Sequence, residues 1–477
     1  MTSAGRLRDA ATAFPYLKAA IVLGGAFYLY IAAVTISQAQ GDLGNISWSK
    51  VVVFALAPIC IFCAVRYPVV FPLGGYIALS PFDALFSVSG AASLVRIIGF
   101  AALAAMSLRM LRLRKVNVPH RSWYFWLALV AYCALTLLWS VALDDSIKKL
   151  SSVFMLFVMM TLLATYPVTA REFKTILAIF VLSSVGAGIF AFNQFIHGAV
   201  SFSGNNRLDL SHNGFTIDVN YLGGSFVAPM AFAFAGMFYG KQLWLRVACT
   251  IAALIFIAGV SVNGSREALC GVVAIFLYFV VRGKNRLTTL ALGGLSLCSL
   301  AFFPNILNRL FEPSVADGSG RTEIWRTGMH SFSDHWLLGS GLDAFPTIYD
   351  QNLLQTYMRN FPGWHRPGHS IVFESLIDLG IVGGLLVAAC WYTSFRQLSI
   401  IPKTSGFYGI RLACEGAIIG LAISAVFLDP LNIKFVWFMH SLVLMALNVY
   451  NPRPIGFGKH DAPPMPAFVR PHAYRGG

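Results

Sequence analysis

The chain has 477 residues, of which 57% are hydrophobic and 12% charged, and its formal net charge is +15. Soluble proteins carry about twice that share of charged residues. The composition therefore excludes a water-soluble globule, and with it nucleic-acid-binding proteins, dinucleotide-binding enzymes and secreted disulfide scaffolds. The apolar residues come in long runs instead of at helical or strand spacing, which predicts helices embedded in lipid.

Runs of about 20 apolar residues can span a bilayer, and they predict an all-α polytopic membrane protein with about 12–14 transmembrane helices. The pairs of runs around Pro68 and around Asn263 have a second interpretation, in which each pair is one broken or re-entrant element; this alternative gives the lower count. The predicted helices lie near residues 17–36, 50–65, 68–85, 90–108, 123–141, 150–166, 173–196, 220–239, 246–262, 267–281, 288–303, 369–391, 411–427 and 434–450.

The basic residues predict the orientation of these spans. Short cytoplasmic loops hold an excess of Lys and Arg, and about two thirds of the 35 Lys and Arg residues fall on one side if both termini are cytoplasmic. The chain then divides into a cytoplasmic segment at 1–18, transmembrane helices at 19–303 with a short external loop at 197–219, a large external loop at 304–368, transmembrane helices at 369–450 and a disordered cytoplasmic tail at 451–477.

The large external loop holds five arginines, no lysine and nine aromatic residues. A planar guanidinium binds phosphate oxygens through two hydrogen bonds and stacks on rings, whereas lysine offers a point charge. An alternative is an amphipathic loop that lies on the lipid headgroups. Within the loop, Arg321 and Trp325 share one face of a predicted helix, and Arg321 sits in its first turn, where the helix N-terminus also attracts anions.

The span after this loop begins with His369, whose imidazole can take a proton from a hydroxyl when it is neutral. At about 100° per residue along a continuous helix, Gly380 and Gly383 lie on the face below the histidine. That face is predicted to be smooth, so that another helix or a lipid tail can approach it closely.

The opposite side of the same span carries two acids, Glu374 and Asp378. An acid at this depth in the hydrocarbon needs a partner or a function. Arg96 is the first candidate partner for Asp378, because it is the basic residue that falls well inside another predicted span.

Together these motifs resemble the O-antigen ligase and polymerase superfamily of bacterial surface-polysaccharide enzymes. The resemblance covers about residues 200–390, and the first 200 residues match it only in hydropathy. It rests on His369-Ser370 followed by Gly380-x-x-Gly383, on GRTEIW from Gly320 and the later GSGLDAF, on GSREA around Arg266, and on Arg207 with DVNYLGG from Asp218.

The resemblance implies a metal-independent glycosyltransferase without a cofactor, which works on the periplasmic face of the bacterial inner membrane. Its donor would be a glycan linked to a polyprenyl diphosphate. Transfer to lipid A core would make it an O-antigen ligase, whereas transfer to a second lipid-linked glycan would make it a polymerase of O-antigen or exopolysaccharide. No Asp-x-Asp motif or His/Cys cluster in the sequence suggests a metal.

Within this hypothesis, His369 is the base that activates the acceptor and Arg321 neutralises the diphosphate. Arg266 has an alternative interpretation as a charge that snorkels to the membrane surface at a helix junction, and Arg207 and His365 have alternatives as ordinary loop residues. Asp218 and Asn220 are expected to cap or orient the helix that follows them. The candidate substrate-binding residues are Arg266, Arg207, Arg326, Trp325 and His365, and the candidate structural or coupling residues are Arg96, Asp378, Glu374, Asp218, Asn220, Gly380 and Gly383.

A transporter of polysaccharide or lipid-linked glycan is the alternative from another class, since many spans and a few buried charges also describe secondary carriers. Most of the unusual residues lie in the external segments, which favours an enzyme. The carrier hypothesis gains if Asp378→Asn abolishes surface glycan while His369→Ala leaves it intact.

Overall fold

The computed structural model describes residues 58–86, 93–197, 218–283, 321–355 and 363–456, with short pieces at 200–201, 207–208, 211–212 and 215–216 and a few positions between 286 and 294. The predicted span at 17–36, nearly all of the span at 288–303 and most of the tail lie outside these residues. Helices make up most of the described chain, and its six strands form three two-stranded pairs. The prediction of an all-α polytopic membrane protein is confirmed.

Eight helices in the described part of the chain are long and apolar enough to cross a membrane. Three of them consist of more than one element, since α6 and α18 each continue into a short 3-10 turn and α9 runs on into α10. The helices are α5 (Leu94–Leu113), α6 (Arg121–Leu135), α7 (Leu143–Thr165), α8 (Ala170–Ile196), α9 (Val219–Ser225) with α10 (Val227–Tyr239), α11 (Leu243–Asn263), α18 (Ile371–Gln397) and α19 (Tyr408–Ala425).

The two ambiguous pairs of runs have different outcomes. Around Pro68, the helices Pro58–Arg66 and Val69–Asp83 meet at a bend of 106°, as expected of a broken or re-entrant element; the second of these contains α4 (Gly74–Leu79). Around Asn263, α11 qualifies as a span by itself. It ends at Gly264, and α12 (Arg266–Arg282) starts anew after Ser265, whose hydroxyl accepts the Ala268 N–H.

Small residues bring the central helices into close contact. At Gly271 of α12, an added Cβ would lie 2.8 Å from the carbonyl oxygen of Gly420 on α19. The Ser424 hydroxyl donates to the Glu267 carbonyl at 2.8 Å across the same contact. Because lipid tails are as apolar as the helix faces, close backbone packing of this kind is what holds such helices together. The apolar α20 (Lys434–Tyr450) packs on α7 and completes the bundle.

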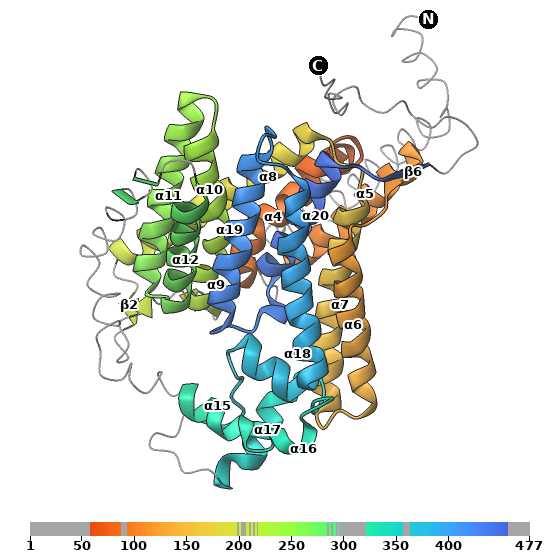
Figure 1. Cartoon of the computed structure of the whole chain (residues 1–477), viewed down its shortest axis with the longest axis vertical. Coiled ribbons are helices and arrows are strands. Elements are labelled where there is room, and N and C mark those ends of the chain that lie inside the picture. Colours follow the sequence, from red (N-terminus) through yellow and green to blue (C-terminus); the bar gives the residue numbers. More distant parts are fainter. Residues whose placement is uncertain are drawn as a thin grey trace, which may run out of the picture.

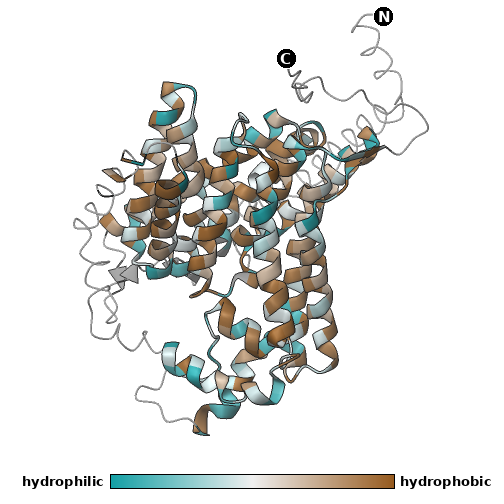
Figure 2. Cartoon of the chain, viewed as in Figure 1, coloured by the Kyte–Doolittle hydropathy of each residue, from teal (hydrophilic) through white to brown (hydrophobic). Residues whose placement is uncertain are grey.

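A layer of short helices lies at one end of the bundle, below α18 in Figure 1. It contains α15 (Arg321–Met329), α16 (Phe332–His335) and α17 (Phe345–Asn352). Figure 2 shows that this layer is more hydrophilic than the long helices above it. It nevertheless packs around a small apolar core, formed by Ile324, Phe345, Ile348, Tyr349, Leu353 and, from α18, Ile377.

The opposite end of the bundle carries an antiparallel pair of strands, β1 (Lys115–Asn117) and β6 (Pro454–Gly456). This pair fixes the segment after α20 beside the loop between α5 and α6. The basic residues at positions 109–121 therefore lie at the same end of the molecule as Arg453, and α15–α17 lie at the other end (Figure 1).

The continuous helix expected after His369 is wrong, because α18 is broken at Gly380, which has φ +67° and ψ −170°. The preceding loop crosses the helix at this break. Trp336 O accepts the Ile381 N–H at 2.9 Å, and Asp378 O accepts the Gly341 N–H at 2.9 Å. Gly380 thus contacts the loop backbone instead of forming a smooth face for a helix or lipid tail. The spacing of 100° per residue does not apply across position 380, because α18 is not a continuous helix there.

The expected pairing of Asp378 with Arg96 is also wrong. The Asp378 carboxylate accepts the backbone N–H groups of Asp343 at 3.0 Å and Phe345 at 2.7 Å, so it holds the start of α17. Arg96 lies exposed in the first turn of α5. A buried acid can be satisfied by backbone donors from a neighbouring segment as well as by a charged side chain.

Candidate active site

Arg321 connects the helix layer to the membrane helices. It is the first residue of α15, and its Nη1 donates to the carbonyl oxygen of Phe427 at 3.2 Å, just after α19. Its Nη2 lies 3.9 Å from Oε1 of Glu267 on α12, and both side chains are largely buried. The RTEIW and GSREA motifs, which are 55 residues apart between Arg266 and Arg321, therefore meet at this contact.

Trp325, one turn further along α15, fixes the chain just before the candidate base. Its indole Nε1 donates to the Gly368 carbonyl at 2.6 Å. Its ring stacks on Phe373 of α18, with the ring centroids 4.5 Å apart. An indole is well suited to such a place, because it buries a large apolar surface and still supplies one directed donor.

His369 precedes α18 in a left-handed backbone conformation, with φ +48°. Its N–H donates to Oε1 of Glu374 at 2.7 Å, which holds this conformation. Ser370 is the N-cap of α18, and its hydroxyl accepts the N–H of Phe373. Within the described residues the imidazole itself makes no hydrogen bond.

The surroundings favour a neutral imidazole. Burial lowers the pKa of His369 below its usual 6.5, and the charges of Arg321 and Arg366 lower the pKa further, against a weaker opposing effect of Asp218 and Asp429. Protonation of the ring is therefore unfavourable near pH 7. A neutral, half-buried imidazole beside guanidinium groups can act as a general base next to an anion.

The DVNYLGG and GSREA motifs pack directly on each other. Asp218 is the N-cap of α9, where its carboxylate accepts the N–H of Asn220 at 2.7 Å and of Tyr221 at 3.3 Å. This is the structural role expected of Asp218. At Gly223, an added Cβ would lie 2.6 Å from the Cβ of Ser265. A glycine is needed at position 223 because α9 approaches the turn before Arg266 this closely.

Four of the predicted residues lie away from this centre or outside the described side chains. His365 is exposed and pairs with Asp350, which accepts its backbone N–H at 2.6 Å and lies 3.2 Å from its Nδ1. Arg326 is exposed on α15, and Arg96 is exposed on α5. Arg207 lies in β3 (Arg207–Leu208), and its side chain is outside the described part of the chain.

Three charged residues near the centre were not found from the sequence: Glu267, Lys149 and Asp429. Glu267 is 3% exposed and faces Arg321. Lys149 of α7 pairs with Asp429 and, at 3.1 Å, with Asp343. Each lies near the end of an apolar run, which is typical of an ordinary interfacial residue. Only for Glu267 was there a signal, since it follows Arg266 in the GSREA motif.

An open apolar groove with about 830 Å³ of empty space runs between α18 and α19. It begins at Ile371 and Val372, immediately after the cap of α18, and extends to Trp391 and Ala422. The groove thus leads from the neighbourhood of His369 along the surface of two membrane helices.

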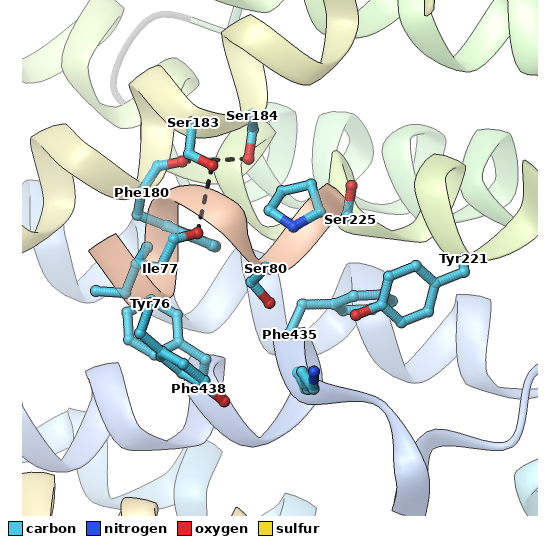
Figure 3. Close-up of a pocket in the computed structure, with 12 residues that line it drawn as sticks. Tyr76, Ile77, Ser80, Phe180, Ser183, Ser184, Tyr221, Ser225, Phe435 and Phe438 are labelled. Carbon is cyan, nitrogen blue, oxygen red and sulfur yellow. Dashed lines mark hydrogen bonds between the residues drawn. The ribbon is translucent and has the colours of Figure 1, made fainter. Parts of the chain in front are cut away.

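A separate pocket with about 410 Å³ of empty space lies between α4, α8, α9 and α20 (Figure 3). The Ser183 hydroxyl donates to the Ala78 carbonyl at 2.8 Å and lies 3.3 Å from the Ile77 carbonyl. The charged residue in its lining, Lys434, pairs with Asp83. His369 and Arg321 are not part of this lining, so the pocket lies outside the candidate active site.

Comparison with known protein families supports the resemblance seen in the sequence. Residues 251–388 match the family model described as O-antigen ligase. The chain carries an O-antigen ligase domain. This supports its place in the O-antigen ligase and polymerase superfamily. No curated protein sequence matches the chain significantly.

The O-antigen ligase domain contains Arg266, Arg321 and His369, but the candidate site extends beyond it. Lys149 and Asp218 precede the matched segment, and Asp429 follows it. The helices on both sides of the domain therefore complete the surroundings of His369.

Proposed function

We propose that the chain is a metal-independent glycosyltransferase, which moves a glycan from a polyprenyl diphosphate to an acceptor hydroxyl on the periplasmic face of the bacterial inner membrane. The observation that carries this proposal is the convergence of Arg321 and His369 within the O-antigen ligase domain. Arg321 is tied to Phe427 and Glu267, and its charge helps to keep the imidazole of His369 neutral.

The proposed reaction breaks the bond between the anomeric carbon and the diphosphate oxygen. Negative charge develops on the departing polyprenyl diphosphate, and Arg321 and Arg366 stabilise that charge in a partly dehydrated site. On the opposite side of the anomeric carbon, His369 takes the proton of the acceptor hydroxyl while the new glycosidic bond forms. The products are the lengthened acceptor and the free polyprenyl diphosphate.

The groove between α18 and α19 supports a lipid-linked donor. Its lining is apolar and lies on two membrane helices, and one end begins two residues after His369. A polyprenyl chain in this groove would hold the diphosphate near Arg321 and convert an encounter between two molecules into a reaction within one complex.

The proposed side of the membrane follows from the distribution of basic residues. The loop between α5 and α6 and the segment after α20 pair at one end of the bundle, and both are rich in arginine or lysine. If that end is cytoplasmic, α15–α17 and His369 face the periplasm.

For the acceptor we propose lipid A core, which makes the chain an O-antigen ligase. The alternative acceptor is a second lipid-linked glycan, which makes it a polymerase of O-antigen or exopolysaccharide. Glycan analysis of a deletion strain separates the two. Long polymer that accumulates on the carrier lipid indicates a ligase, and single repeat units on the carrier indicate a polymerase.

The direct test is transfer by the purified protein in lipid nanodiscs, with a defined polyprenyl-diphosphate glycan and the two acceptors offered in turn. We expect one acceptor to be glycosylated and the reaction to withstand a chelator such as EDTA. Loss of all transfer on chelation would contradict metal independence, and failure of both acceptors would contradict the proposed reaction.

A further inference from the structure

A cluster of buried charges lies beside the candidate site. The side chain of Lys149 is 10% exposed, and its ammonium group contacts carboxylates from two distant segments, Asp343 at 3.1 Å and Asp429 in a direct ion pair. The same cavity, with about 260 Å³ of empty space, is also lined by Glu374 and Asp378 of α18.

The charges in this cluster are unbalanced. Among the described residues, Asp343 comes from the loop, Glu374 and Asp378 from α18, and Asp429 from the segment between α19 and α20. Lys149, from α7, is the single cation that pairs with them there. Carboxyl groups packed this closely in a poorly hydrated site are costly to ionise together, and the ammonium group of Lys149 stabilises the ionised ones.

Two acids of this cluster, Asp429 and Glu374, are connected to candidate catalytic residues. Asp429 lies two residues after Phe427, whose carbonyl accepts from Arg321. Glu374 accepts the backbone N–H of His369 at 2.7 Å. Lys149 therefore lies between the segment after α19, which binds Arg321, and the start of α18, which binds His369.

The loop partner adds a second connection. Asp343 has a left-handed backbone with φ +61°, and its N–H donates to the carboxylate of Asp378, one turn after Glu374. The ion pair with Lys149 holds Asp343 in this conformation, which glycine, asparagine and aspartate adopt more readily than most other residues. The start of α17 is thereby fixed against α18.

We propose that Lys149 is a positioning residue for the transfer reaction: its ammonium group ties the loop at Asp343 to the membrane segment at Asp429, and so sets the distance between Arg321 and His369. This inference rests on the proposed function. Lys149 lies in α7, more than 100 residues before the O-antigen ligase domain, so a helix outside that domain would set its active geometry.

The test compares Lys149→Met, Lys149→Arg and the control Lys148→Met in nanodiscs. Lys148 is the neighbouring residue, but its side chain is 75% exposed and its ion pair in the described part of the chain is with Asp145, whose side chain is 38% exposed. We expect Lys149→Met to lower kcat about 100-fold with a much smaller change in KM, because a misplacement of about 1 Å at the reacting groups has an effect of that size. Lys149→Arg should retain most of the rate, and Lys148→Met should match the wild type.

A charge-compensating variant distinguishes positioning from general loss of structure. Asparagine tolerates the left-handed backbone at position 343, and Asp343→Asn removes one of the uncompensated anions. The double variant Lys149→Met with Asp343→Asn should therefore be at least several-fold faster than Lys149→Met alone. A double variant no faster than the single one, or equal losses in Lys149→Arg and Lys149→Met, would overturn the proposal.

A measurement without turnover separates this inference from the proposed function. The rate at which diethyl pyrocarbonate modifies His369, followed by mass spectrometry of its peptide, should rise several-fold in Lys149→Met and stay unchanged in Lys148→Met. If this holds while the wild type transfers no glycan, the positioning role stands and the proposed function fails. If neither the modification rate nor kcat changes in Lys149→Met, the positioning role is refuted.

Discussion

Gly380→Ala should destabilise the protein by about 2–6 kcal/mol. A backbone with φ +67° and ψ −170° is adopted almost only by glycine and costs any other residue about 1–3 kcal/mol. The added Cβ would also lie 2.5 Å from the backbone nitrogen of Gly339 and in contact with the carbonyl oxygen of Leu337. Both are backbone atoms, so relief of the overlap must separate the loop from α18.

That separation would weaken two hydrogen bonds across the break, from Ile381 N–H to Trp336 O at 2.9 Å and from Val382 N–H to Leu337 O at 3.2 Å. Each contributes about 0.5–1.5 kcal/mol, and together with the backbone cost the total loss is about 2–6 kcal/mol.

Gly384→Ala is the matched control, because it lies one turn further along the same helix. Its added Cβ would meet only the Leu376 side chain, at an ordinary 3.5 Å. Alanine is also favoured over glycine within a helix by about 0.5–1 kcal/mol. Thermal unfolding of both variants in nanodiscs should give a much lower midpoint for Gly380→Ala. Equal midpoints would refute the account of the α18 break.

Two further variants test the surroundings of His369. In Arg366→Gln, the loss of a nearby positive charge makes protonation of His369 easier and raises its pKa. The acid limb of the pH profile of kcat/KM, which lies below pH 6.5 in the wild type, should therefore move to higher pH. An acid limb that stays in place would argue against His369 as the base. Trp325→Phe keeps an aromatic ring against Phe373 but removes the indole N–H that donates to the Gly368 carbonyl. The transfer rate at a saturating concentration of the glycan donor should fall about 3- to 10-fold. An unchanged rate would show that this hydrogen bond does not position His369.

Hydropathy predicted the long helices well because a membrane-spanning run is a local property of the sequence. The run predicted at 173–196 is α8 (Ala170–Ile196), and the run at 123–141 is α6 with its short 3-10 extension. The break at Gly380 depends on tertiary structure. It forms because the segment around Gly339 crosses α18, and an isolated glycine in an apolar run does not indicate such a crossing.

The candidate site was predictable where its residues are unusual for their place in the sequence. Arg321 stands in a loop without lysine, and His369 begins a span. Lys149 gave no such signal, because its partners Asp343 and Asp429 are 194 and 280 residues away in the sequence. A charge in the first turns of an apolar helix becomes informative only when the fold shows which other charges it meets.

The central claim is that the imidazole of His369 activates the acceptor in a glycan transfer from polyprenyl diphosphate. Its most direct test is single-turnover transfer by purified wild type and His369→Gln in nanodiscs, with donor binding measured in parallel. We predict that His369→Gln binds the donor like the wild type but transfers the glycan about 10²- to 10⁴-fold more slowly. Transfer by His369→Gln at the wild-type rate would contradict the claim.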